Sequence, residues 1–417
     1  MVIKRPKYLD QLIANKHNDL IKIITGLRRC GKSYLLFTLF KEHLKEEGVQ
    51  DSHIIEVDLE NRRNKGLRDP DALLAYIDSK IKDDAMYYIL LDEVQYVPEF
   101  EDVLNSYLKV KNADVYVTGS NSKFLSSDII TEFRGRGIQI HVHPLSFAEF
   151  MSVDTRHPLD AWHDYYTYGG LPYVLSLNDD ESKESYLKGL CKKVYLTDIK
   201  ERHEVRLDAE LKELLQIVAS SIGSPTNPSK LEKTFKSVKN VSLSNKTIDT
   251  YLSYFSDAFL MERAIRYDIK GKKYINALAK HYFSDMGVRN AILGFRQTEE
   301  NHIMENIIYN ELRIRGYSVD VGMVETRPVG ENGKRIRKQY EVDFVANKGS
   351  QRYYLQSAFI MPTDAKERQE TASLLNIDDS FRKIIVVKDH IKPKRNQEGI
   401  ITIGLIDFLL KPELMNL

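Results

Sequence analysis

The sequence predicts an α/β fold in which the N-terminal part of the chain forms a parallel sheet flanked by helices. An apolar segment, Leu20–Ile24, runs into a glycine-rich stretch that opens onto a helical pattern from Tyr34 to Lys45. Strand-like segments then alternate with helix-sized stretches as far as Pro144. One of them, Met86–Leu91, is apolar enough to be buried on both faces, which is typical of parallel sheets. Together these observations favour a doubly wound sheet.

The elements expected in this region can be placed one by one from the apolar runs and the polar segments between them. The expected strands are residues 20–24, 53–58, 86–91, 114–118 and 138–142, with a helix over residues 71–81.

The pattern changes twice after Pro144. It is helical from Phe147 to Ile292, apart from a hairpin expected over residues 263–274. Strands return after Glu299 and are expected at residues 319–321, 340–345, 353–356, 384–387 and 400–403, with 330–334 as a hairpin tip or loop. These changes predict three domains, covering residues 1–146, 147–292 and 293–417.

Composition is that of an ordinary folded protein. The chain has 417 residues, 42% of them hydrophobic and 29% charged, which is long enough for about two or three domains. A net charge of +1 provides no general basic field, so any nucleic-acid binding must be local. Only two cysteines, Cys30 and Cys191, are present, which favours a reducing compartment over a disulfide framework. The N-terminus lacks a signal-peptide core and no apolar run approaches a membrane span, so we expect a cytoplasmic protein without a membrane partner.

The glycine-rich stretch has the spacing of a phosphate-binding loop. It reads Gly26-Leu27-Arg28-Arg29-Cys30-Gly31-Lys32-Ser33. Because Gly26 and Gly31 lack a Cβ atom, the backbone can wrap tightly and direct successive N–H groups toward phosphates. The positive end of the following helix adds to that field. Lys32 is expected to bridge the β- and γ-phosphates, and Ser33 to ligate Mg²⁺.

We therefore expect ATP and Mg²⁺ as cofactors. The whole loop and the adjoining Tyr34 are expected to contact the nucleotide.

Two acidic residues end the most apolar strand. Asp92 and Glu93 follow Leu90-Leu91, and the carboxyl edge of a parallel sheet is where ligands bind. Asp92 is suited to hold the Mg²⁺ shell, since Mg²⁺ prefers oxygen ligands. Glu93 is placed to orient and polarise the water that attacks the γ-phosphate. The pair favours ATP hydrolysis over kinase chemistry.

Two further positions are candidates for the same site. Ser120 and Asn121 follow the strand that ends at Thr118, where a polar side chain can sense the γ-phosphate or simply form a Gly-Ser turn. Arg134 and Arg136 precede the fifth strand, and a guanidinium can stabilise transition-state charge in its own site or in a neighbouring chain's. Of the two arginines we favour Arg136, and for both pairs the solvated turn remains an alternative.

These motifs together resemble the AAA-type prokaryotic ATPases that carry a C-terminal domain of unknown function. The resemblance also includes Pro144-Leu145-Ser146-Phe147-Ala148-Glu149-Phe150, Tyr168-Gly169-Gly170-Leu171-Pro172, Lys280-His281-Tyr282-Phe283-Ser284-Asp285-Met286-Gly287 and Glu341-Val342-Asp343-Phe344. It implies a P-loop sheet with an additional strand between the phosphate-loop strand and the Asp92 strand. It also implies a helical lid, a winged-helix module and an α+β C-terminal domain similar to restriction-endonuclease folds.

The middle of the chain has the element order of a winged helix. A helix is expected from Asn227 to Val238 and a second from Ser242 to Phe255, before the hairpin. The second helix offers Lys246 but also Asp249, a sparse basic face for reading DNA. Lysines of the hairpin keep DNA binding open beside a packing or oligomer-contact role: Lys270, Lys272 and Lys273.

The C-terminal region matches only part of a nuclease site. Nucleases of the fold that the resemblance implies use a helix glutamate, a strand aspartate and a following acid-x-lysine to bind metal and activate water. Glu305 and Asp343 fit the first two positions, but Gln356 and Ala358 stand where the carboxylate and the lysine are expected. We expect an inactive scaffold, with a displaced lysine such as Lys366 as the alternative.

The sequence thus predicts Mg²⁺-dependent ATP hydrolysis coupled to a conformational change and to partner binding. Two alternatives remain, an ATP-dependent nuclease acting on DNA or RNA and an ATP-gated regulatory switch with little turnover. Candidate partners are a second copy of the chain, DNA bound through the winged-helix or C-terminal region, and an unidentified protein.

Overall fold

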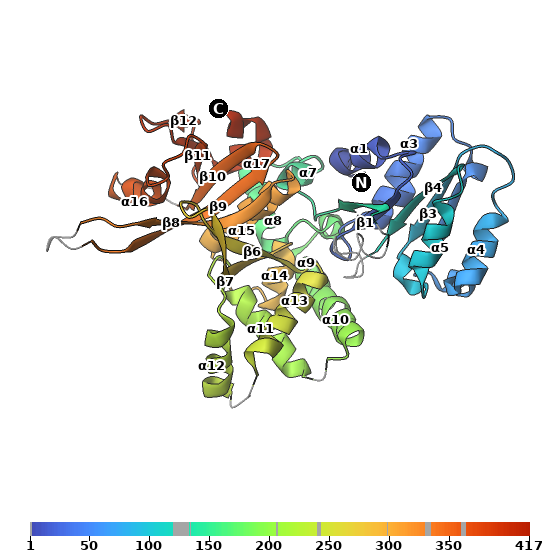
Figure 1. Ribbon diagram of the computed structural model, residues 1–417, viewed down its shortest axis with the longest axis horizontal. Helices are drawn as coiled ribbons and strands as arrows, with labels where there is room; N and C mark the ends of the chain where they lie inside the picture. Colours follow the sequence, from blue (N-terminus) through green and yellow to red (C-terminus); the bar gives the residue numbers. More distant parts are fainter. Residues whose placement is uncertain are drawn as a thin grey trace. The chain divides into compact units, whose positions relative to one another are not determined.

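The chain forms two compact units, each with its own sheet (Figure 1). The computed structural model describes residues 2–119, 133, 135–205, 207–239, 243–297, 299–329, 335–359 and 364–417. The first unit comprises Met1–Pro144, Leu171–Ser176 and Asp257–Phe259, and the second comprises Leu145–Gly170, Leu177–Ser256 and Leu260–Leu417. No helix within these described ranges has both the length and the apolar character of a membrane span.

The first unit contains the predicted parallel sheet. Its strands are β1 (Ile21–Thr25), β2 (Ile54–Asp58), β3 (Tyr87–Asp92), β4 (Ala113–Thr118) and β5 (Gly137–His141). Their order in the sheet is β2-β3-β4-β1-β5, and every neighbouring pair is parallel. This confirms the predicted fold class. Because the strands all run the same way, the segments that follow β1, β3 and β4 emerge at one edge.

Helices cover both faces of this sheet. They are α1 (Pro6–Ala14), α2 (Lys32–Tyr34), α3 (Lys41–Glu46), α4 (Pro70–Asp78) and α5 (Phe100–Tyr107). Helices α4 and α5 pack on one face, where Ile77 and Leu104 join a buried cluster with Ile23 and Ile89. On the other face a π-helical segment, residues 35–40, brings the ring of Phe40 to 4.5 Å from that of Tyr116. Helix α1 is an element that the sequence patterns did not predict.

The second unit contains most of the helices. They are α7 (Phe147–Met151), α8 (Pro158–Tyr168), α9 (Asp180–Leu190), α10 (Leu196–His203), α11 (Asp208–Ser220), α12 (Pro228–Lys239), α13 (Asn245–Asp257), α14 (Met286–Ile292), α15 (Glu300–Ile314), α16 (Asp364–Leu375) and α17 (Leu405–Leu410). A π-helical turn, residues 191–195, joins α9 to α10.

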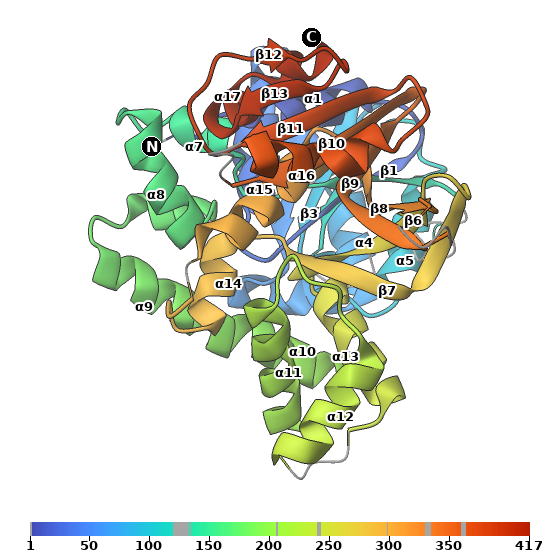
Figure 2. The same cartoon turned by 90° about the vertical axis from the view of Figure 1, so that its left-hand side faces the viewer.

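An eight-stranded mixed sheet completes this unit (Figure 2). Its strands are β6 (Met261–Asp268), β7 (Lys273–Phe283), β8 (Ser318–Thr326), β9 (Lys338–Lys348), β10 (Gln351–Ala358), β11 (Arg382–Val387), β12 (Lys394–Arg395) and β13 (Ile401–Gly404). They are ordered β12-β13-β11-β10-β9-β8-β6-β7. Leu374 and Ile377, in and after α16, pack with Tyr354 and Ile385 on one face of the sheet.

The predicted hairpin of the middle region is part of this sheet. It consists of β6 and β7 and is longer than expected, and β6 pairs in parallel with β8 at Arg266–Asp268. Strands from both sides of residue 292 therefore share one sheet. The predicted loop at 330–334 lies outside the described residues, and the division into three domains stays a prediction.

Close backbone packing explains the glycines of the Tyr168–Pro172 motif. The carboxylate of Asp285 accepts hydrogen bonds from Gly170 N at 2.7 Å and from Val288 N at 2.9 Å, and so caps α14. A Cβ atom at Gly287 would lie 2.0 Å from Tyr168 O, and one at Gly170 would lie 2.4 Å from Leu145 O. The chain at residues 168–170 can approach α14 and Leu145 this closely only because glycines stand at the contacts.

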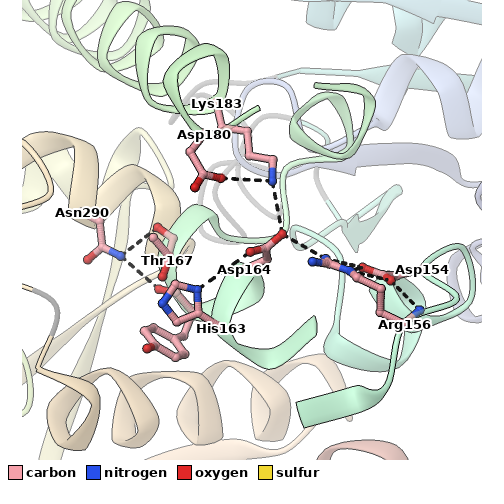
Figure 3. A network of polar contacts seen from close by, with 9 residues as sticks. Asp154, Arg156, His163, Asp164, Thr167, Asp180, Lys183 and Asn290 are labelled. Atoms are coloured by element: carbon pink, nitrogen blue, oxygen red, sulfur yellow. Dashed lines mark hydrogen bonds and ion pairs between the residues drawn. The ribbon is translucent and has the colours of Figure 1, made fainter. Parts of the chain in front are cut away.

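Polar contacts around α8 add to this packing (Figure 3). Asp164 of α8 pairs with Arg156 at 2.9 Å and with Lys183 of α9 at 3.2 Å. Asn290 of α14 is fully buried and donates to the carbonyl oxygens of Tyr166 and Thr167. The pairs of Asp164 hold α8 to Arg156 and to α9, whereas the fully buried Asn290 amide links α8 to α14.

Gly287→Ala is expected to lower the free energy of unfolding by about 3 kcal/mol, because the new methyl group overlaps a backbone carbonyl that cannot move aside. Gly189→Ala is the matched control, since a Cβ atom there meets nothing within 4 Å. Within α9 that alanine should be neutral or stabilising by up to about 1 kcal/mol. Urea unfolding measures both, and equal stability of the two variants would contradict the packing argument.

Candidate nucleotide-binding site

The phosphate loop connects β1 to α2, and its two glycines are required for different reasons. Gly26 has a φ of 138°, and a Cβ atom there would lie 2.1 Å from Val142 O. Gly31 has a φ of 103° and forms the N-cap of α2 in the left-handed region, but a Cβ atom there would make only ordinary contacts, the nearest with Pro172 Cγ at 3.8 Å. Gly26 is therefore needed for space and conformation, and Gly31 for conformation alone.

Lys32 lies over this loop and is almost completely buried, with 4% of its surface exposed. Its Nζ donates to Gly26 O at 3.1 Å and to Leu27 O at 3.3 Å. Neutral carbonyl oxygens are weaker partners for an ammonium group than phosphate oxygens. The ammonium is thus held inside the loop in a position from which it can exchange these carbonyls for a polyphosphate.

Asp92 lies at the end of β3 and is connected to two neighbouring elements. It accepts hydrogen bonds from the hydroxyls of Thr118, at the end of β4, and of Ser33, in α2. Burial raises the pKa of Asp92 to about 6, although these two hydrogen bonds oppose the shift. Ser33 and Asp92 therefore offer two neighbouring oxygen ligands, which suits Mg²⁺.

Glu93 has a strained backbone, with a φ of 53° in the left-handed region. Its N–H donates to Thr118 Oγ1 at 2.9 Å, and its carboxylate accepts a hydrogen bond from the side chain of Gln95. Glu93 is also buried. Strain of this kind in a buried acid is often found at functional sites.

The remaining predicted site residues are Ser120, Asn121 and the two arginines before β5. Ser120, Asn121 and Arg134 lie outside the described residues. Arg136 is exposed and precedes β5, where its carbonyl accepts from Ile21 N at the start of β1. It therefore lies at the amino ends of the strands, whereas the phosphate loop lies at their carboxyl ends, about 20 Å away for six residues of strand. A role for Arg136 in its own site does not fit this geometry, whereas a role in a neighbouring chain's site stays a prediction.

Arg5 is a further residue of the site that sequence reasoning missed. It is buried and donates to Cys30 O at 3.2 Å and to His143 O at 2.7 Å, with its guanidinium 4.6 Å from the ring centre of Tyr8. Arg5 thus fixes the phosphate loop to the chain after β5. Its partners are backbone carbonyls, which no sequence motif records. The local signal in the sequence is Pro6, because proline is common at the first position of a helix. It indicates where α1 begins but not what Arg5 contacts.

Cys30 has a structural role in the loop. Its Sγ donates to Val142 O at 3.2 Å, and burial raises the pKa of the thiol. A thiol held protonated in this way is a poor nucleophile.

The C-terminal acids that the sequence singled out do lie together. Glu305 of α15 and Asp343 of β9 both approach Nζ of Lys280 from β7, at 2.9 Å and 3.8 Å. Burial, with Glu305 nearby, raises the pKa of Asp343. Burial alone would lower the pKa of Lys280, but the surrounding carboxylates, Glu305 first among them, raise it above its ordinary value.

The remaining two positions of the nuclease pattern carry no charge. Gln356 lies beside Asp343, whose N–H points to Gln356 Oε1 at 3.4 Å. Ala358 is buried in the cluster under α16. The side chain of Lys366, the alternative lysine, falls outside what the structure describes.

Comparison with known proteins identifies two matched regions. A family model described as an AAA domain matches residues 18–151, and one described as a domain of unknown function (DUF8612) matches residues 159–299. An uncharacterized protein of Haemophilus influenzae is 34% identical over 98% of this chain and 99% of its own length. An uncharacterized protein of Methanocaldococcus jannaschii is 29% identical, over 91% of this chain and 84% of its own length. Among solved structures, a Walker-type ATPase of Pyrococcus abyssi aligns with a TM-score of 0.49 at 15% identity, covering 70% of this chain and 96% of that one.

Lys32→Ala should abolish ATP binding and hydrolysis together, because the main cationic contact to the phosphates is lost. Calorimetry with ATP and Mg²⁺ measures the affinity directly. Lys45→Ala is the matched control, since this exposed lysine of α3 pairs with Asp51 away from the loop. Unchanged ATP affinity in Lys32→Ala would exclude the loop as the phosphate site.

Arg5→Met should weaken ATP binding by about tenfold, equivalent to about 1.4 kcal/mol, because the loop loses the guanidinium that ties Cys30 O to His143 O. Lys4→Met removes an exposed charge one residue away and should bind normally. Thermal unfolding is followed in parallel. An affinity loss that disappears when folded fractions are matched would assign Arg5 to stability alone.

Proposed function

This chain belongs to a family of prokaryotic proteins that join an AAA domain to a domain of unknown function, and we propose that it hydrolyses ATP with the help of Mg²⁺. Its P-loop fold is a nucleotide-binding one. The observation that supports hydrolysis is the convergence of Lys32, Ser33, Asp92 and Glu93 at one edge of the β1–β5 sheet.

The phosphate loop supplies the binding. Backbone N–H groups of residues 26–33 and the start of α2 face the phosphates, and Lys32 transfers its hydrogen bonds from Gly26 O and Leu27 O to phosphate oxygens. Ser33 and Asp92 hold Mg²⁺, which neutralises phosphate charge when bound. Asp92 must be ionised to hold Mg²⁺. Since its pKa is raised to about 6, binding of Mg²⁺ is favoured above a pH of about 6.

Glu93 is the proposed general base. Its carboxylate orients and polarises the attacking water, and Thr118 fixes the backbone from which it extends. Gln95 donates a hydrogen bond to this carboxylate and would have to release it before a water can take its place. The hydrogen bond to Gln95 also supports the alternative of a slowly turning ATP-gated switch, because it competes with that water.

The proposed cellular role is nucleotide-dependent binding of a partner. Self-association would let Arg136 of one chain complete the site of another. Within its own sheet, Arg136 lies at the amino ends of the strands, away from the phosphate loop. DNA remains a candidate partner at the β6–β7 hairpin, where Lys272 and Lys273 are exposed, although Lys270 pairs with Asp378. The oligomeric state with and without a non-hydrolysable ATP analogue, measured by light scattering, tests the first of these roles.

Glu93→Gln should keep ATP and Mg²⁺ bound and slow hydrolysis by about 10²–10⁴-fold, the usual contribution of a positioned general base. Single-turnover phosphate release measures the chemical step. Glu99→Gln is the matched control, because Glu99 is an exposed glutamate with a similar φ of 52°. Equal single-turnover rates in wild type and Glu93→Gln would remove Glu93 from the mechanism and favour the switch.

A further inference from the structure

A lysine lies at the centre of the acid cluster in the second unit. Nζ of Lys280 is 2.9 Å from Glu305 Oε1, 2.8 Å from Glu341 Oε1 and 3.8 Å from Asp343 Oδ1. Only 2% of Lys280 is exposed. A single buried ammonium group therefore occupies the point at which three carboxylates converge.

We propose that Lys280 takes the place of a metal ion in this cluster. The resemblance of the chain implied a domain similar to restriction-endonuclease folds, in which the corresponding acids would hold a divalent cation. Mg²⁺ requires near-octahedral oxygen coordination at about 2.1 Å. Such an ion does not fit here, because the space between the carboxylate oxygens is filled by Nζ of Lys280.

The carboxylates are also engaged by other donors. The hydroxyl of Tyr282 donates to Glu305 Oε1 at 2.7 Å, and Ser357 N donates to Asp343 Oδ2 at 2.8 Å. Arg266 Nη2 lies 3.6 Å from Glu341 Oε2 and provides a second cation. A metal would have to displace these partners as well as the lysine.

The neutral residue at the third position of the nuclease pattern fits the same interpretation. Oε1 of Gln356 accepts from Ser373 Oγ at 3.3 Å and faces Asp343 N. A carboxylate there would add a further negative charge to a cluster in which Lys280 and Arg266 are the cations paired with the acids among the described residues. The cluster is thus an internal ion pair network that holds β7, β9 and α15 together, and this part of the chain is a scaffold that does not cut nucleic acids.

Mn²⁺ titration followed by electron paramagnetic resonance, without nucleotide, tests the proposal. Wild type and Asp343→Asn should give the same titration, because the cluster binds no metal in either protein. Lys280→Met removes the cation and leaves the carboxylates unbalanced, so its Tm should fall, and Mn²⁺ should restore Tm while about one further ion binds per chain. Lys394→Met, at an exposed lysine of β12 in the same sheet, is the matched control and should behave as wild type.

Three results would overturn the proposal. The first is Mn²⁺ binding by wild type that Asp343→Asn loses, which decides the matter even if Lys280→Met does not fold. The second is a folded Lys280→Met that gains no Mn²⁺ site. The third is cleavage of DNA or RNA by wild type with Mg²⁺ or Mn²⁺, with or without ATP, that disappears in Asp343→Asn.

Discussion

The parallel direction of β1 to β5 is the constraint on which the candidate nucleotide-binding site depends. Because all five strands point the same way, the loop after β1 and the acids after β3 emerge at one edge, although more than 60 residues separate them in the chain. Strand β4 lies between β1 and β3 and ends in Thr118. Its hydroxyl contacts both the Asp92 side chain and the Glu93 backbone, so the middle strand positions both acids.

A buried ion pair fixes the register of these strands. It lies on the face of the sheet opposite α4 and α5. Lys22 of β1 is fully buried and pairs with Asp114 of β4, which also accepts hydrogen bonds from the hydroxyl of Tyr116 and from His17 N. Burial lowers the pKa of Lys22, and Asp114 opposes that shift. A slip of one residue would turn Lys22 toward the apolar core under α4 and α5. The free energy of folding would then include the penalty of an unpaired buried charge, which is far larger than that of a misplaced apolar side chain. Both units therefore bury a lysine among carboxylates, where an unpaired charge would be strongly destabilising.

Much of the first unit was predictable because its signals are local. Apolar runs predicted all five strands, and the spacing of Gly26, Gly31 and Lys32 predicted the loop between β1 and α2. Arg136 shows the limit of this approach, since closeness to a strand in sequence does not say at which edge of the sheet a residue lies. The proposed roles of the site residues still await experiment.

Arg5 and Lys280 escaped prediction for a different reason. Arg5 contacts carbonyl groups 25 and 138 residues away, and Lys280 contacts Glu305 at a separation of 25 residues. Such pairings depend on how distant segments meet, and hydrophobic periodicity does not carry that information. The acid-x-lysine pattern concerns residues that follow Asp343, whereas Lys280 lies on a strand that precedes it, so the pattern gives no indication of Lys280.

The segment Leu171–Ser176 gives the phosphate loop a covalent path to the packing of α8 on α14. It belongs to the first compact unit, whereas the residues before and after it belong to the second. Pro172 lies beside the loop, since a Cβ atom at Gly31 would be 3.8 Å from its Cγ. Two residues earlier, Gly170 is held by Asp285 through its N–H and by Leu145 N through its carbonyl. Proline has a fixed φ, and Gly170 is held on both sides. Leu171 is therefore flanked by a residue anchored in the second unit and by a residue that lies beside the phosphate loop, and the chain passes from one unit to the other between two restrained positions.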